Sequence, residues 1–253
     1  GSHVIPKNDL EKIALNNQAK DILVSKFATH FIIQSPLALD SIKKFKKLNV
    51  ENYLLYKPIM WGYKKNTLNK KYNKSRKITL LHASTSKTLC VRPLIYETSN
   101  EYINSLNTLC NCVNKNNNFE LIIKVRSTKE CSINSIKQLV KTGNNCKIIY
   151  DIDFVDLLDQ CDYLLSYSST TIEESLNAFK PVIIYGYSNR YIHINADNKI
   201  IFNANPSNIE QLLINIYKSN NLKSIQKKDY YKYIWKDEMK NIDNFISDFF
   251  SIQ

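Results

Sequence analysis

Short apolar runs alternate with helical patterns along most of the chain, and this alternation limits the fold more than any other feature. Beyond residue 77 each run that predicts a strand, except the run at 181–185, is followed by apolar residues spaced as on one face of a helix. The predicted strands are 77–82, 119–125, 147–150, 163–166, 181–185 and 199–202. The predicted helices are 100–113, 133–141, 154–160, 171–179, 208–219 and 236–250. The order predicts an α/β protein with a Rossmann-like, doubly wound parallel sheet.

The upstream part of the chain is too short for a second complete domain of this kind. It predicts helices at 9–24 and 37–48 and strands at 27–34 and 53–56. We therefore expect residues 4–63 to be the tail of an N-terminal lobe or a small appended α/β layer. We expect residues 64–77, rich in lysine, to be a basic linker, and residues 78–253 to be the Rossmann-like domain with the C-terminal helices. Residues 1–3, Gly-Ser-His, match the remnant of a cleaved purification tag, so the natural chain is expected to extend further upstream.

Glycine is scarce, and its scarcity excludes several classes of nucleotide-binding protein. The chain has four glycines in 253 residues, and apart from Gly1 they stand far apart, at Gly62, Gly143 and Gly186. They form neither G-x-G-x-x-G nor a P-loop, which excludes kinases, P-loop NTPases and ordinary dinucleotide oxidoreductases as first choices. A phosphate group would have to be held by other chemistry.

Charge and cysteine content suggest where the protein works. The chain carries 35 basic and 23 acidic residues, a formal net charge of +12. This balance favours polyanionic partners, although lysines on a solvated surface explain it equally well. The six cysteines come without a secretory signal and are interpreted as thiols of a cytosolic protein. There is no C-x-x-C pair and no histidine at ligand spacing, so no metal site is expected.

The segment that follows the strand at 163–166 is the most informative for function. Ser168, Ser169, Thr170 and Thr171 lie between this strand and the next predicted helix. The N-terminus of a helix favours an anion because its N–H groups are unpaired and its dipole end is positive. Four hydroxyls there could replace a glycine-rich phosphate cradle.

A helix cap is the alternative interpretation of the same residues. Thr170-x-x-Glu173 and Thr171-x-x-Glu174 both match the capping box, in which the side chains satisfy the helix N–H groups internally. The sequence leaves both interpretations open.

Three stretches together resemble a known family. ITLLHAST, FELIIKVRS and DFVDLLDQCDYLLSYSSTTIEESLNAFKPVIIYG are similar to the C-terminal, donor-binding domain of GT-B glycosyltransferases. The pattern is nearest to bacterial capsule, teichoic-acid, sialic-acid and Kdo transferases. The resemblance implies a transferase that uses a CMP-, CDP- or UDP-linked donor without a metal or other cofactor. It implies that Ser168, Ser169, Thr170 and Thr171 bind the donor phosphate and that Glu173 or Glu174 lies near the ribose or sugar.

Further residues are candidates by their position in this family pattern. Lys124 and Arg126 stand where the family has Lys-x-His-Pro, and arginine there can hold a phosphate. The alternative for both is a solvated strand end. Arg190, Tyr191 and His193 are candidates for contact with the sugar or the acceptor, or form an ordinary loop.

The catalytic base is not identified by the sequence. His82, at the end of the first strand of the domain, and His30, in the upstream part, are the candidates because imidazole can accept a proton from an acceptor hydroxyl. A structural histidine is the alternative for His82.

These observations predict a transferase of bacterial surface polysaccharide biosynthesis. Its expected partners are a nucleotide-sugar donor and a carbohydrate or lipid-linked acceptor, without specific nucleic acid binding. Its expected place is the cytoplasm, with peripheral contact to the inner face of the plasma membrane through the basic surface. The alternatives are a sugar-nucleotide epimerase or hydrolase, and a non-catalytic basic binding module.

Overall fold

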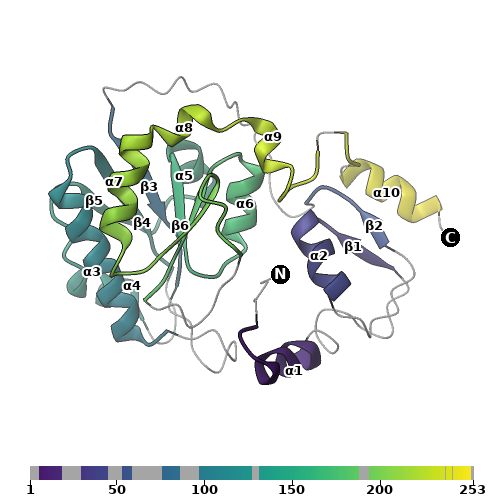
Figure 1. The fold of residues 1–253 in the computed structure, drawn as a ribbon, viewed down its shortest axis with the longest axis horizontal. Helices are drawn as coiled ribbons and strands as arrows, with labels where there is room; N and C mark the ends of the chain where they lie inside the picture. The colour runs from purple at the N-terminus through teal and green to yellow at the C-terminus, as the bar shows by residue number, and fades with distance from the viewer. Residues whose placement is uncertain are drawn as a thin grey trace.

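A six-stranded parallel sheet forms the centre of the larger part of the molecule (Figure 1). The computed structural model describes residues 6–18, 30–44, 53–58, 76–85, 97–126, 131–187, 194–236, 238–240 and 242–251. The strands are β3 (Ile78–His82), β4 (Phe119–Lys124), β5 (Cys146–Ile149), β6 (Tyr163–Ser166), β7 (Val182–Tyr185) and β8 (Ile201–Ala204). Their order across the sheet is β5-β4-β3-β6-β7-β8, and every neighbouring pair is parallel. Counted within this domain the order is 3-2-1-4-5-6, so the predicted doubly wound α/β class is confirmed.

Helices cover both faces of this sheet (Figure 1). On one face α3 (Ser99–Lys115), α4 (Ile133–Leu139) and α7 (Ile209–Ser219) pack on strand residues such as Leu121 and Ile123. On the other face α5 (Phe154–Gln160), α6 (Thr171–Asn177) and the region of α9 (Lys227–Tyr230) pack on residues such as Leu81 and Ile122. Because both faces are buried, the inner strands are continuous apolar runs, which is why the sequence located them well.

A smaller layer precedes the large sheet in the chain. It contains α1 (Asp9–Gln18), β1 (Phe31–Ile33), α2 (Pro36–Lys44) and β2 (Tyr53–Leu55), with β1 and β2 paired in parallel. The predicted strand at 27–34 and the predicted helices at 9–24 and 37–48 each extend into residues outside the described part. The predicted linker at 64–77 lies outside it except for Arg76 and Lys77.

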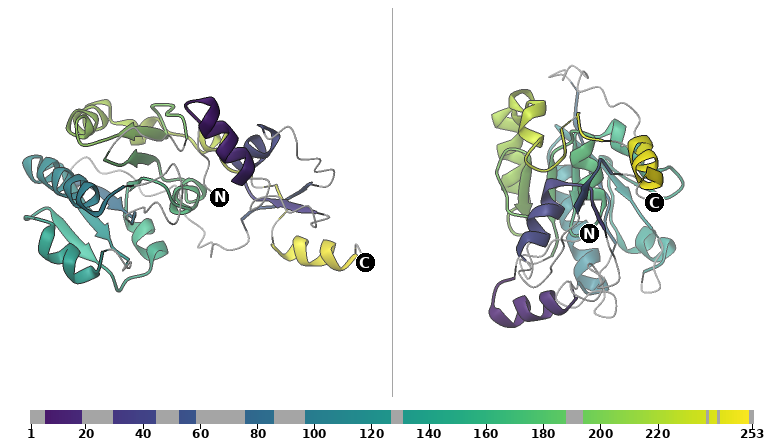
Figure 2. Two further views of the ribbon diagram at one scale, coloured as in Figure 1. Left: turned by 90° about the horizontal axis from the view of Figure 1, so that it is seen from below. Right: turned by 90° about the vertical axis from the view of Figure 1, so that its right-hand side faces the viewer.

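The end of the chain returns to this smaller layer. Tyr56 Oη donates a 2.6 Å hydrogen bond to Asp248 of the last helix, α10 (Ile242–Ser251). The Lys57 N–H donates to the carbonyl of Lys240 at 2.9 Å, and Trp235 Nε1 donates to the carbonyl of Ile33 at 3.2 Å. Figures 1 and 2 show α10 beside β1 and β2, away from the six-stranded sheet. The division into domains remains a prediction. It assigned the C-terminal helices to residues 78–253, whereas α10 contacts the smaller layer upstream of the large sheet.

Some details of the second half differ from the sequence prediction. Strand β8 begins at Ile201, two residues later than predicted, because the Asp197 carboxylate accepts the N–H groups of Lys199, Ile200 and Ile201 and holds them in a turn. Two short helices, α8 (Asn221–Ser224) and α9, were not predicted. Helix α7 ends as predicted at Ser219, where Asn220 takes the left-handed conformation with φ 51°.

Candidate nucleotide-binding edge

The strand order reverses between β3 and β6, and the residues singled out in the sequence meet there. From this pair the chain builds outward to β4 and β5 on one side and to β7 and β8 on the other. Doubly wound sheets bind ligands beyond the carboxyl ends of the strands at such a switch point. His82 ends β3, and Ser168, Ser169 and Thr170 follow β6. The topology therefore brings the histidine and the hydroxyl segment to one edge.

Hydroxyl groups tie the two strand ends together. Ser166 Oγ donates to the carbonyl of Ala83 at 3.0 Å. Thr171 Oγ1 lies 3.4 Å from the same carbonyl and 3.3 Å from Ser166 Oγ. Thr171, predicted to bind phosphate, thus has partners within the protein and helps to fix the geometry of the edge.

The other hydroxyls of the segment are not used in this way. Ser168 is fully buried, and its Oγ has no hydrogen-bond partner among the residues that the structure describes. Ser169 is half-buried, and its Oγ accepts the Thr171 N–H at 3.3 Å. Thr170 is exposed and precedes α6, but its side chain makes no capping hydrogen bond. The capping-box interpretation of Thr170 and Glu173 is therefore wrong. The buried hydroxyl of Ser168 has no partner within the described residues, which ordinarily costs about 1–3 kcal/mol.

His82 lies buried between two tyrosine rings. Its exposed fraction is 1%, and its ring centroid is 6.3 Å from that of Tyr102 and 6.4 Å from that of Tyr185. Burial lowers the pKa of His82 to about 4, so the imidazole is neutral at pH 7. Within the described chain, its Nδ1 has no hydrogen-bond partner. A neutral imidazole can donate one hydrogen bond and accept another, which suits ligand contact better than proton abstraction.

The two tyrosines are held in place by the main chain. Tyr102 Oη donates to the carbonyl of Ser84 at 2.8 Å, and Tyr185 Oη donates to the carbonyl of Ser105 at 2.7 Å. The first of these bonds fixes the loop that follows β3 against α3. The two rings that flank His82 are thus each anchored by a hydrogen bond to the main chain.

Glu97 is a buried acidic residue that the sequence analysis missed. Its exposed fraction is 4%, and its carboxylate accepts the N–H of Tyr187, just beyond β7, at 3.0 Å. Burial, and after it the nearby Glu97 charge, raises the pKa of Tyr102. Glu97 therefore lies close to a tyrosine that flanks His82. The available signal was the capping box Thr98-x-x-Glu101, which starts α3 earlier than predicted and places Glu97 at its entrance.

Two carboxyl groups occupy the first turn of α6. Glu173 is buried and Glu174 is half-buried. Burial raises the pKa of both, and the charge of Glu173 raises that of Glu174 further. Their position at the same edge is compatible with contact to ribose or sugar hydroxyls, which remains a prediction.

The remaining candidates lie elsewhere. Lys124 Nζ donates to the carbonyl of Tyr150 at 2.7 Å, so this ammonium group supports the loop after β5. Arg126 is exposed beyond the end of β4, one strand away from the switch point. His30 is exposed and precedes β1 in the smaller layer. Arg190, Tyr191 and His193 lie outside the described residues. The roles of these residues stay predictions.

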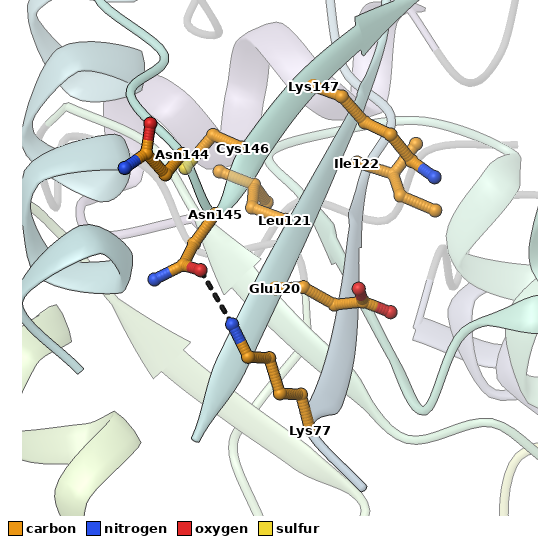
Figure 3. A pocket seen from close by; sticks show the side chains of 8 residues that line it. All are labelled: Lys77, Glu120, Leu121, Ile122, Asn144, Asn145, Cys146 and Lys147. Carbon is orange, nitrogen blue, oxygen red and sulfur yellow. Dashed lines mark hydrogen bonds between the residues drawn. The ribbon is translucent and has the colours of Figure 1, made fainter. Parts of the chain in front are cut away.

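A small hollow of about 130 Å³ lies at the opposite edge of the sheet (Figure 3). It is lined at the amino ends of β4 and β5 by Lys77, Glu120, Leu121, Ile122, Asn144, Asn145, Cys146 and Lys147. Lys77 Nζ donates to Asn145 Oδ1 at 2.6 Å across it. No candidate residue from the sequence lines this hollow, so it is separate from the switch point.

Two absences hold for the part of the chain that the structure describes. It contains no cluster of three or more His, Cys, Asp or Glu side chains arranged for a metal ion. No helix within it has the length and apolar character needed to cross a membrane.

Comparison with known proteins identifies the fold. No protein-family model matches the sequence, and no curated protein sequence matches it significantly. A mutant of TarM from S. aureus, solved with Fondaparinux, alpha-GlcNAc-glycerol and UDP, matches 91% of this chain with a TM-score of 0.50 and 15% identity. HepE from Anabaena, solved with UDP and glucose, matches 96% with a TM-score of 0.48 and 14% identity. UDP-GlcNAc 2-epimerase from Neisseria meningitidis, bound to UDP-GlcNAc, matches 76% with a TM-score of 0.42 and 14% identity.

The chain has a GT-B-like fold, as its resemblance to the donor-binding domain of GT-B glycosyltransferases implied. At these sequence identities the similarity concerns the fold alone, and the match to TarM is the one on which this conclusion rests. The chain covers 45% of TarM, 67% of HepE and 47% of the epimerase, so it spans about half to two thirds of the length of these proteins.

Proposed function

We propose that this chain binds a nucleotide-activated donor at the switch point between β3 and β6 and acts in glycosyl or polyol-phosphate transfer. One observation carries the proposal. Two buried polar atoms without partners in the described chain, His82 Nδ1 and Ser168 Oγ, lie on the strand end and the loop that meet at this edge. Buried polar atoms are nearly always satisfied, so a pair of exceptions at a ligand-binding edge argues for a ligand that satisfies them.

The proposed chemistry follows from the donors at this edge. The hydroxyls of Ser168 and Thr170 would bind the donor phosphates, in place of a glycine-rich loop. When the bond to the sugar breaks, negative charge grows on the phosphate, and fixed donors stabilise that charge. His82 would contribute a neutral hydrogen bond, while Glu173 or Glu174 would contact hydroxyls of the ribose or sugar.

The acceptor and the biological setting rest on charge and on the family resemblance. The formal net charge of +12 suits a lipid-linked or anionic carbohydrate acceptor at a negatively charged membrane face. Surface polysaccharide biosynthesis is the setting that combines such an acceptor with a nucleotide-sugar donor, so we place the activity there.

Thermal unfolding with a panel of nucleotides tests the proposal. CMP, CDP, UDP and GDP, each free and as sugar conjugates, are added at concentrations up to millimolar. A ligand at a hundred times its Kd stabilises the native state by about 2.7 kcal/mol, which shifts Tm by several degrees in a protein of this size. We expect one pyrimidine nucleotide to give such a shift, and Ser168→Ala or Thr170→Val to weaken it about tenfold or more in Kd. Ser207→Ala, which removes an exposed hydroxyl in the turn before α7, is the matched control.

Two results would contradict the proposal. One is the absence of any nucleotide-specific shift in the folded protein. The other is equal, steeply salt-dependent binding of every polyanion, heparin included, which would identify a basic binding module. Incubation with a UDP-sugar and no acceptor separates transferase from epimerase, because only an epimerase would convert the sugar while it remains linked to the nucleotide.

A further inference from the structure

Two cysteines lie in contact where α3 packs on β5. Cys110, in the middle of α3, is fully buried, and Cys146, the first residue of β5, is 8% exposed. Cys146 Sγ lies 3.8 Å from the carbonyl oxygen of Cys110. The sulfur of Cys146 therefore lies against the main chain of Cys110, and the two cysteines belong to two different elements of the fold.

The two thiols differ in character. The hydrogen bond from Cys110 lowers the pKa of Cys146, whereas the same bond, with burial, raises the pKa of Cys110. Cys146 lines the hollow at the amino edge of the sheet, whereas Cys110 is fully buried and does not, so Cys146 is the nucleophile of the pair and Cys110 the second thiol. Cys161 offers a contrast: its Sγ donates to Leu158 within α5, and burial raises its pKa to about 12.

The hollow at the amino edge gives this pair a route to small molecules. Cys146 is one of its lining residues, together with Lys77 and Lys147 (Figure 3). Its volume of about 130 Å³ exceeds that of a hydroperoxide such as hydrogen peroxide, which is little larger than water.

We propose that Cys146 and Cys110 form an oxidisable dithiol that closes to a disulfide between β5 and α3. In the first step the Cys146 thiolate attacks one oxygen of hydrogen peroxide, the O–O bond breaks, and the products are a sulfenic acid and water after protonation of the released hydroxide. In the second step the Cys110 sulfur attacks the sulfenic sulfur, an S–S bond forms, and the S–O bond breaks to release a second water. Overall the dithiol loses two electrons and two protons, and one peroxide is reduced to two waters.

Peroxide treatment of the folded chain followed by mass spectrometry tests this inference. The protein is exposed to hydrogen peroxide at a few molar equivalents, alkylated, and digested with trypsin. We expect a mass decrease of about 2 Da and a cross-link between the peptide of residues 142–147 and the peptide that holds Cys110. Cys90 and Cys112 share that second peptide, because trypsin does not cleave between Arg92 and Pro93, so Cys90→Ser and Cys112→Ser are the matched controls and each must retain the cross-link.

The variant Cys110→Ser supplies the second measurement. Without the second thiol, oxidation should stop at a sulfenic acid on Cys146, which dimedone traps as a stable adduct. Each variant is compared only after its thermal unfolding shows a folded protein. The inference is overturned if Cys146 stays reduced in the folded wild type, or if the cross-link survives Cys110→Ser. The test uses no nucleotide, so it stands apart from the proposed function.

Discussion

The hydroxyl of Ser166, at the end of β6, donates a 3.0 Å hydrogen bond to the main-chain carbonyl of Ala83, just beyond β3. These residues are 83 positions apart in the chain, and their bond holds together the two strand ends at which the sheet reverses its order. The candidate edge is therefore held together by a side chain whose hydroxyl is engaged within the protein.

Removing this link should destabilise the fold. Ser166→Ala is expected to lower the free energy of unfolding by about 1 kcal/mol, because the Ala83 carbonyl keeps only its longer contact with Thr171. The double variant Ser166→Ala/Thr171→Val leaves that carbonyl without a side-chain donor and should cost more than the sum of the two single changes. Urea unfolding followed by circular dichroism gives these values. Thr108→Val, on the exposed side of α3, should change little, and strict additivity in the double variant would contradict the shared role.

Gly186 is expected to tolerate no side chain. A Cβ atom at this position would overlap the ring of Tyr167, which is 3% exposed and directly precedes Ser168. We expect Gly186→Ala to destabilise the protein by about 1–3 kcal/mol, as overpacking of a core does. If the Tyr167 ring is the cause, adding Gly186→Ala to a Tyr167→Ala background should cost much less than it costs in the wild type. The four proteins can be compared by thermal unfolding.

Stability should fall as pH decreases because of His82. The pKa of His82 in the folded protein is about 4, below the ordinary value of 6.5. Its contribution to the free energy of unfolding is therefore fully present above pH 6.5 and is lost as pH falls through 4. A shift of this size corresponds to a loss on the order of 3 kcal/mol. His82→Phe, which does not titrate, should lack this part of the pH dependence between pH 7 and 4. The NMR signal of His82, assigned by its loss in His82→Phe, would contradict this prediction if it shifted with a midpoint near pH 6.5 in the folded protein.

Glu174 should give a pH dependence of stability opposite to that of His82, with stability lost as pH rises. Burial, and then the charge of Glu173, raises its pKa, so its contribution is present at low pH and is lost as pH rises through the raised value. Glu174→Gln is therefore expected to increase the free energy of unfolding at pH 7, and this gain should disappear below pH 4. If Glu174 also contacts the donor, the same variant binds nucleotide-sugar more weakly while it is more stable. A variant that is less stable at pH 7 would show that Glu174 has a favourable charged partner.

The local sequence pattern was sufficient to predict the helices and strands, but it did not predict the hydrogen-bond partners of individual side chains. Strand β6 and the start of α6 were predicted at the observed residues, because an apolar run buried on both faces ends abruptly at a group of hydroxyls. The position of Glu97 and the turn held by Asp197 were not predicted. Both depend on hydrogen bonds to main-chain groups whose position no periodic pattern encodes.

The candidate site shows the same division. The sequence placed His82 and Ser168 near a ligand edge, but it could not show that Thr171 is engaged by Ala83 or that Lys124 is engaged by Tyr150. Those partners are distant in the chain and become neighbours only through the strand order. The sequence thus predicted which side chains lie at the switch-point edge. Only the fold shows which of them are already hydrogen-bonded within the protein.

The return of α10 to the first layer has a mechanical consequence. The polypeptide passes between the layers twice, once before β3 and once between α9 and α10, where Trp235 and Lys240 already contact the first layer. Because two chain segments connect the smaller layer with the part that contains the six-stranded sheet, the two parts can rotate relative to each other only about the line through these segments. A single connection would allow rotation in every direction. Cutting the second crossing would therefore change how the layers approach each other while leaving every strand of the large sheet intact.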